Sequence, residues 1–175
     1  LDIWALPSSV PALLQRGISP KLIISTDPGV YASFHYRGIA NSPHSLVAYP
    51  LTAYPGISRL TDRRAILDQG GALESSLFRM LRVPRVPIAA NGTVAGTAYN
   101  LALNFDAPII FGGLDFATCC DKEHAEPHPF QTLRETNAHR LEPILFRRMD
   151  TMFSRYPMLI GNGVRTNQPM STYGN

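Results

Sequence analysis

Several short runs of apolar residues constrain the fold most strongly, and each ends at, or within two residues of, a glycine, a proline or an aspartate. They are KLIIST (21–26), SLVAYP (45–50), VPIAA (86–90) and IIFGG (109–113). The runs have strand length and do not alternate polar with apolar residues, so they predict strands buried on both faces of a sheet. Such a sheet needs helices on each side, which favours an α/β fold.

The segments between these runs predict helices. Residues 8–16, 72–81 and 94–104 are the candidates, and the last carries apolar or small side chains at helical spacing. Strand, helix and strand in succession over 86–113 describe a βαβ unit, in which the two strands pair in parallel through a right-handed crossover. We therefore predict a Rossmann-like open, mostly parallel sheet with helices on both faces.

The last part of the chain has a different character. Pro143 suits the start of a helix, and one apolar stripe follows it until Pro157. We interpret this helix as packing against the sheet or against a partner, and the closing segment 161–175 as a loop. The predicted domains are an α/β domain over 1–130 and a helical extension over 131–175. The stripe consists of Leu141, Ile144, Leu145, Met149, Met152, Phe153 and Tyr156.

Composition excludes several classes of protein. Hydrophobic residues make up 45% of the chain and charged residues 17%, which is typical of a globular protein. The net charge of +3 comes mainly from scattered arginines rather than a basic block, which argues against nucleic acid and suits an anionic small molecule. No membrane-spanning run or signal peptide is present. The two cysteines are adjacent, so we expect no disulfide framework and a cytoplasmic protein.

Two aspartates directly follow predicted strands. Asp27 comes after the run 21–26, and Asp115 comes two residues after the run 109–113. In open α/β sheets, ligands bind beyond the carboxyl ends of the strands, where two carboxylates can hold Mg²⁺ that bridges substrate phosphates. Aspartates are also common in ordinary turns. Either role suits Asp27 and Asp115.

A third candidate is the stretch Asn91-Gly92-Thr93, which opens the helix over 94–104. The free N–H groups at the start of a helix can receive a phosphate or a carboxylate, and Gly92 allows close approach. Asn91 or Thr93 can equally serve as an ordinary N-cap. The stretch matches neither GxGxxG nor a Walker A loop, so no standard nucleotide motif decides between these roles.

The segment CCDKEHAEPHP concentrates residue types that bind metals. It lacks the familiar zinc spacings, so a polar surface loop is the favoured interpretation, with a metal site as the alternative. His124 is better placed as a substrate contact or as a general acid or base, because the loop leaves the same predicted edge of the sheet. The potential ligands are Cys119, Cys120, His124, Glu126 and His128.

Two long stretches resemble one known family. They are ALPSSVPALLQRGISPKLIISTDPG (5–29) and NGTVAGTAYNLALNFDAPIIFGGLDFA (91–117), the second followed closely by His124. These stretches resemble the 6-hydroxymethylpterin diphosphokinase-like domain, which also occurs in flagellar motility accessory factors. The resemblance runs in order over about residues 1–130. It implies functional roles for Asp27 with Pro28, for Gly92 and Thr93 at the helix start, and for Gly113, Asp115 and His124.

The family resemblance implies two activities. Archaeal members transfer diphosphate from ATP to a hydroxymethyl pterin and need Mg²⁺, whereas motility members are expected to transfer nonulosonic sugars, carried as CMP-sugars, to flagellin. Two features depart from the family pattern. The glycine-rich loop of the family, with its strand, is expected upstream of Leu1, and Leu114 stands where a polar residue is common.

Three hypotheses follow from these observations. We expect first a transferase that uses a nucleotide-activated donor, with Asp27 and Asp115 at a metal or donor and Asn91 to Thr93 at an anionic group. The second is the pterin diphosphokinase. The third is a non-catalytic binding or assembly domain that keeps the fold and lacks the donor loop. The oligomeric state stays open, with a homo-oligomer among the alternatives.

Overall fold

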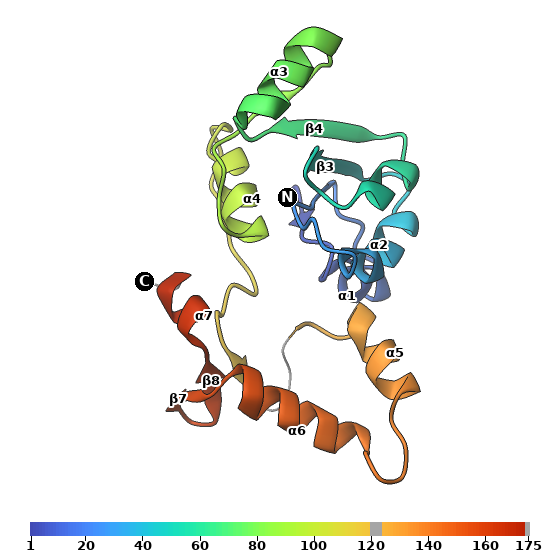
Figure 1. The fold of residues 1–175 in the computed structure, drawn as a ribbon, viewed down its shortest axis with the longest axis vertical. Coiled ribbons are helices and arrows are strands. Elements are labelled where there is room, and N and C mark those ends of the chain that lie inside the picture. The colour runs from blue at the N-terminus through green and yellow to red at the C-terminus, as the bar shows by residue number, and fades with distance from the viewer. Residues whose placement is uncertain (120–123, 174–175) are drawn as a thin grey trace. The chain divides into compact units, whose positions relative to one another are not determined.

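The computed structural model describes residues 1–119 and 124–173 and has a mixed α/β fold (Figure 1). The chain divides into two compact units, Leu1–Ile110 and Phe111–Asn175. The first unit contains a parallel sheet flanked by helices, which confirms the predicted Rossmann-like class. The predicted domain boundary at residue 130 stays a prediction, because a compact unit is not by itself an independently folding domain. Within the described ranges, no helix combines the length and apolar character that crossing a bilayer requires.

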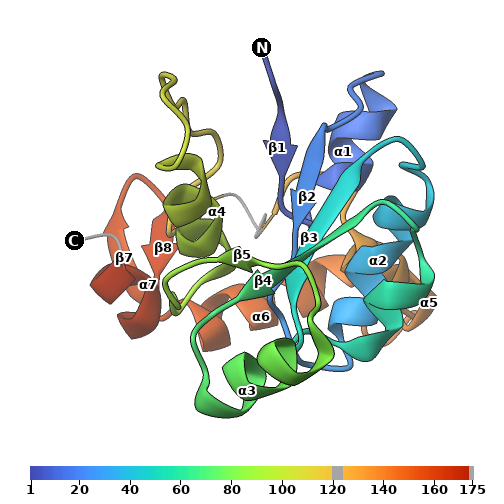
Figure 2. The same cartoon turned by 90° about the horizontal axis from the view of Figure 1, so that it is seen from above.

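The sheet of the first unit has five strands in the order β1-β2-β3-β4-β5, and every neighbouring pair is parallel. Figure 2 shows β1, β2 and β3 side by side. In the central pair, Ile23 lies opposite Val47 and Ile24 opposite Ala48. The strands are β1 (Trp4–Ala5), β2 (Leu22–Ile24), β3 (Leu46–Pro50), β4 (Arg64–Asp68) and β5 (Val86–Pro87).

The central strands have no polar face. All three residues of β2 and the last four of β3 are buried. A strand of a parallel sheet is covered on both sides, which is why its sequence is apolar throughout rather than alternating. The buried strands predicted at 21–26 and 45–50 are therefore confirmed. The strand predicted at 86–90 is present only as β5, whose two residues are both exposed, so its predicted burial is wrong. Strands β1 and β4 are additional.

One face of the sheet is covered by α1 (Val10–Gln15), α2 (Ala32–Ala40) and the 3-10 helix η1 (Pro55–Arg59). Their buried side chains form one cluster with alternate residues of the strands. Gly38 allows α1 and α2 to approach, because a Cβ there would lie 3.1 Å from both Pro11 and Val10. The members of this cluster are Ala5, Val10, Ile23, Ala32, Tyr36, Ile39, Val47, Tyr49, Ala53 and Ile57.

The opposite face is covered by α4 (Val94–Ala102), which confirms the helix predicted over 94–104. Leu101 of α4 packs with Ile24 of β2 and Leu67 of β4. Beyond the end of α4, the ring of Phe105 meets Trp4 of β1 edge to face, with centroids 5.4 Å apart. Helices therefore lie on both faces of the sheet, as the sequence predicts.

The connection from β4 to β5 contains α3 (Ala72–Leu81), which also confirms a predicted helix. Glu74 and Phe78 are its buried residues. Arg82 ends the helix in the left-handed region, with φ of 53°. The opposite side of α3 is exposed to solvent. Leu73 and Met80 lie on it, and each is more than two-thirds exposed.

The second unit contains a small antiparallel sheet in the order β6-β8-β7. Its strands are β6 (Thr118–Cys119), β7 (Met158–Gly161) and β8 (Val164–Thr166), and its helices are α5 (Pro129–Thr136), α6 (Ile144–Arg155) and α7 (Gln168–Tyr173). Helix α6 confirms the predicted C-terminal helix. The prediction of a loop over 161–175 is wrong, because this segment contains β8 and α7. Asn162 and Gly163 both adopt positive φ and form the two-residue turn of the β7–β8 hairpin.

The strand predicted over 109–113 is also wrong. These residues pair with no strand of the part that the structure describes, and the side chain of Ile110 is 82% exposed. An apolar run becomes a strand only where a neighbouring strand supplies hydrogen-bond partners for its backbone. This segment instead connects the two compact units. The parallel sheet is thus real, but the βαβ unit over 86–113 lacks its second strand.

Burial of the central strands predicts a specific stability pattern. Replacing Ile23, which is fully buried between the two layers, by alanine should lower the free energy of unfolding by about 2–5 kcal/mol because it leaves a cavity. The matched control is Leu73→Ala on the exposed side of α3, which should change that energy by no more than about 0.5 kcal/mol. Urea denaturation followed by circular dichroism measures both, and equal effects would contradict the assigned core.

Candidate functional site

Four loops leave the carboxyl ends of β2, β3, β4 and β5, and in parallel strands these ends lie at one edge of the sheet (Figure 2). We call these loops the carboxyl rim. They comprise residues 25–29, 51–54, 69–71 and 88–93. Of the residues selected from sequence, Asp27 and Asn91 to Thr93 lie on this rim.

Hydrogen bonds tie neighbouring loops of the rim together. The backbone N–H of Tyr54, after β3, donates to the carbonyl oxygen of Asp27, after β2, at 2.9 Å. A second tie runs through the side chain of Glu74 in α3. Its Oε1 accepts from the N–H of Leu51 at 3.2 Å, and its Oε2 accepts from the N–H of Gln69 at 3.1 Å. One carboxylate thus holds the loops after β3 and β4.

Glu74 is only 7% exposed, and sequence reasoning missed its role. It lies in the first turn of α3, where the helix dipole favours a negative charge. A buried carboxylate is costly unless charge-assisted hydrogen bonds compensate it, and the two backbone N–H groups provide these. The sequence offered one signal for this role, a glutamate early in a helix that follows Gly70-Gly71. The signal was not sufficient, because the two N–H partners of Glu74 lie on separate loops.

Asp68 ends β4 and was also not predicted as part of the site. Its carboxylate accepts from the N–H of Gly70 at 3.0 Å, from Ser75 Oγ at 3.4 Å and from Arg85 Nε at 2.8 Å. The Gly70 N–H, together with the Arg85 guanidinium, lowers the pKa of the Asp68 carboxyl despite the opposing effect of burial. Arg85 also lies over the ring of Phe78. Asp68 therefore organises the rim rather than facing a ligand.

Asp27 has a different environment, because its side chain is exposed. Its Oδ1 accepts from the N–H of Gly29 at 2.8 Å, the turn geometry that was one of the two interpretations of this residue. The neighbouring Ser25 lies 3.4 Å from the phenol of buried Tyr36. Burial raises the pKa of Tyr36, and the negative charge of Asp27 adds to this effect. An exposed carboxylate beside a neutral phenol is thus available at the rim.

The stretch Asn91-Gly92-Thr93 forms a conventional N-cap at α4. Thr93 Oγ1 accepts from the N–H of Gly96 at 2.9 Å, and Asn91 Oδ1 accepts from Thr93 N and Oγ1 at 3.1 and 3.2 Å. A Cβ on Gly96 would collide with the Asn91 side chain, so this glycine permits the arrangement. The cap interpretation is confirmed, and binding of an anion by the same stretch stays a prediction.

Gly113, Asp115 and His124 belong to the second unit. Gly113 has φ of 77°, and Asp115 is exposed in the loop before β6. His124 is exposed and stacks on His128, with ring centroids 4.2 Å apart and planes 17° from parallel. His128 caps α5 through Nδ1, which accepts from Phe130. Because Asp27 and Asp115 lie in different units, their joint action stays a prediction.

Binding of Mg²⁺ is compatible with Asp27, the one acid within the four loops of the carboxyl rim. An exposed carboxylate suits this ion, which takes one or two protein carboxylates and keeps several waters. Asp68 and Glu74 do not suit it, because their oxygens are engaged by the protein. In residues 1–119 and 124–173, no group of three His, Cys, Asp or Glu side chains is placed to hold a metal. Cys120, one of the potential ligands, lies outside the described residues.

Comparison with known proteins finds sequence similarity to a bacterial protein. An uncharacterized protein of Treponema pallidum (strain Nichols) is 31% identical over 147 residues, which cover 82% of this chain. The chain spans about a third (32%) of the length of that relative. No family model and no solved structure matches the chain.

The role of Glu74 predicts a stability effect. Replacement by glutamine keeps the shape but puts an NH₂ group against a backbone N–H, so the free energy of unfolding should fall by about 1–3 kcal/mol. The control is Asp62→Asn, the same removal of charge at an exposed position before β4, which should change it by no more than about 0.5 kcal/mol. Thermal or urea unfolding measures both. An unchanged stability of the Glu74→Gln protein would show that the carboxylate does not hold the two loops.

Proposed function

We propose that this chain is the Rossmann-like part of a transferase that uses a nucleotide-activated donor and belongs to the 6-hydroxymethylpterin diphosphokinase-like family. The observation that carries the proposal is the carboxyl rim. Its loops after β2, β3 and β4 are held by a shared hydrogen-bond network, while one carboxylate, Asp27, is left exposed among them. Rigid loops at this edge are where open α/β sheets bind ligands.

The polar groups of the rim suit a phosphorylated donor. In the proposal, the N–H groups and dipole at the start of α4 face the donor phosphates, with Asn91, Gly92 and Thr93 beside them. Asp27 holds Mg²⁺, which neutralises phosphate charge when it is bound. The family resemblance adds a role for Gly113, whose φ of 77° suits glycine.

The reaction proposed first is sugar transfer of the motility-accessory-factor kind, with a CMP-sugar as donor and flagellin as acceptor. An acceptor hydroxyl oxygen bonds to the anomeric carbon while the bond from that carbon to the donor phosphate oxygen breaks, and the nucleotide leaves with the electron pair. The hydroxyl proton passes to a general base, a role for which the family resemblance suggests His124 or Asp115. The resemblance of residues 5–29 and 91–117 to the family supports this choice. The activity of the whole protein, like its cytoplasmic location, belongs to the proposal.

Direct binding measurements test this function. Isothermal titration of the full chain with CMP, a CMP-nonulosonate and ATP, each with and without Mg²⁺, should show Mg²⁺-dependent binding of the cytidine ligands. Asp27→Ala should weaken that binding about tenfold to a hundredfold because it removes a charged ligand. The matched control is Asp62→Ala, the same change in the exposed segment before β4, which should leave the affinity unchanged.

The other outcomes separate the alternatives. Binding of ATP together with a hydroxymethyl pterin, followed by AMP release, would favour the diphosphokinase over the sugar transferase. Binding of none of these ligands, by this chain or by the whole Treponema pallidum relative, would contradict both enzymes and favour the non-catalytic binding domain.

A further inference from the structure

Two buried hydroxyl groups lie at the carboxyl rim and have no role in the proposed function. Ser25 follows β2, and its N–H still donates to the carbonyl oxygen of Ala48 in β3 at 3.0 Å. Strand residues alternate between faces, so Ser25 faces the same side as Ile23, the side that α2 covers. There its Oγ lies 3.4 Å from the phenol oxygen of Tyr36, and the two residues are only 2% and 3% exposed. We call these two groups the rim hydroxyls.

One hydrogen atom of the rim hydroxyls has no acceptor in the protein. Each group carries one O–H hydrogen, and the single contact between them uses one of the two, whichever group donates. Across residues 1–119 and 124–173, neither oxygen has another hydrogen-bond partner. A buried donor without an acceptor destabilises a fold, so a donor of this kind indicates a bound partner.

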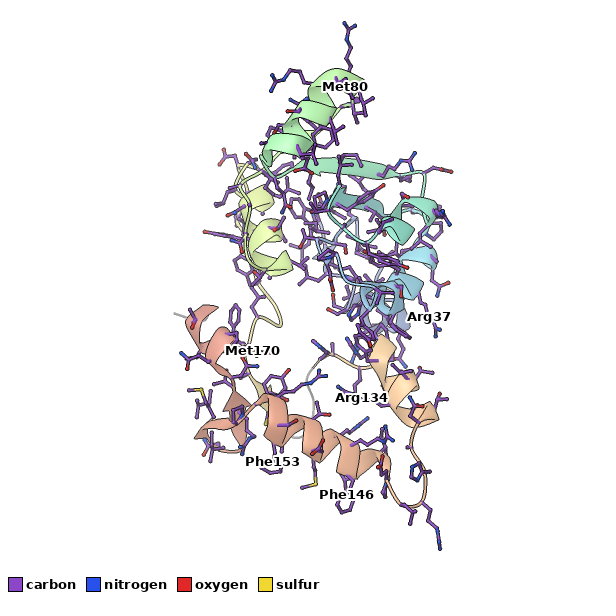
Figure 3. The ribbon with its side chains drawn as sticks, in the orientation of Figure 1. Arg37, Met80, Arg134, Phe146, Phe153 and Met170 are labelled. Carbon is purple, nitrogen blue, oxygen red and sulfur yellow. The ribbon has the colours of Figure 1, made fainter. Side chains whose placement is uncertain are left out.

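The phenol of Tyr36 is held between the two rim loops that follow β2 and β3. Its ring contacts the ring of Tyr54, with centroids 6.1 Å apart. The Tyr54 ring lies against Gly56, where a Cβ would come within 2.7 Å of the ring atom Cε1. Arg37, the next residue of α2, is exposed and projects outward from the helix (Figure 3). The helix therefore presents Tyr36 to the rim and keeps the charge of Arg37 in solvent.

The carboxylate of Asp27, two residues after Ser25, decides which acceptor fits. Burial raises the pKa of Tyr36 and the negative charge of Asp27 raises it further, so the phenol keeps its hydrogen at neutral pH. A phosphate oxygen could accept this hydrogen, but the carboxylate repels its charge. A ligand hydroxyl suits both groups, because it accepts from the rim hydroxyls and donates to Asp27. The Gly29 N–H uses one of the about four lone pairs of the carboxylate, so a hydroxyl and Mg²⁺ can share it.

We propose that the rim hydroxyls and Asp27 together bind one ribose hydroxyl of the nucleotide donor. The ligand oxygen accepts the spare hydrogen of the rim hydroxyls, and its own hydrogen is donated to Asp27. The inference rests on the proposed use of a nucleotide, and it holds for either donor, because a CMP-sugar and ATP both carry ribose. Ser25 and Tyr36 are then residues that select a ribonucleotide over its deoxy form.

Deoxynucleotides test the proposal. Isothermal titration of the full chain with CMP, 2′-deoxy-CMP and 3′-deoxy-CMP, and with ATP and its two deoxy forms, should show that loss of one ribose hydroxyl weakens binding about tenfold. The double variant Ser25→Ala, Tyr36→Phe should lower this ratio about threefold or more, because only the bond to Asp27 remains. The ratio is taken within one protein, so a smaller folded fraction of the variant does not alter it.

The matched control is Ser42→Ala. This residue is also buried, but its hydroxyl already donates to the carbonyl oxygen of Gly38 at 3.1 Å, before β3 begins. The control should therefore keep the ratio of the unchanged chain. Retention of the full ratio by the double variant would overturn the proposal.

The ribose contact and the proposed function fail in different ways. Equal binding of the nucleotides and their deoxy forms by the unchanged chain would overturn the ribose contact and leave the donor site intact. If no nucleotide binds, the proposed function is wrong, and ribose 5-phosphate added to the isotope-labelled chain tests the hydroxyls directly. Amide shifts in residues 25–29 that weaken in the double variant would support the ribose contact by itself. No shifts there would overturn both.

Discussion

The structure of the first unit depends on one constraint. Neither face of the strands β2 and β3 carries a charged or strongly polar side chain that could face solvent. Both faces must therefore be covered, and the chain does so with α1, α2 and η1 on one side and α4 on the other. Connecting successive strands through covering segments keeps the strands parallel. Parallel strands in turn gather all of their carboxyl ends at one edge, which is the physical origin of the carboxyl rim.

Loops at such an edge form a site only if they hold a defined arrangement. In this chain the rim is held by carboxylates whose oxygens already accept hydrogen bonds from other groups of the protein. Glu74 binds two loops through their backbone N–H groups, and Asp68 fixes Arg85 and the turn at Gly70. Asp27 is the one acid within the rim loops, and its side chain is exposed. This division between acids that build the rim and an acid that faces solvent is the main reason to regard the rim as a ligand site.

The sequence predicted the parallel sheet and several helices because their signals are local. Apolar runs mark β2 and β3, and Thr93 marks the start of α4. It missed β4, whose run begins with Arg64 and ends with Asp68, and α2, which contains Gly38. The strand predicted at 109–113 failed because pairing depends on a neighbour that no local pattern reveals. Glu74 was missed for the same reason, since its partners are 5 and 23 residues away along the chain.

The most direct test of a ligand site at the carboxyl rim is which backbone amides a nucleotide perturbs. Amide chemical shifts of the isotope-labelled chain, recorded while CMP or ATP is added with Mg²⁺, report contact residue by residue. A ligand site at the carboxyl rim predicts shifts concentrated in residues 25–29, 51–54, 69–71 and 88–93. Shifts concentrated at the opposite ends of the strands, in 20–21, 43–45 and 61–63, would contradict a ligand site at the carboxyl rim.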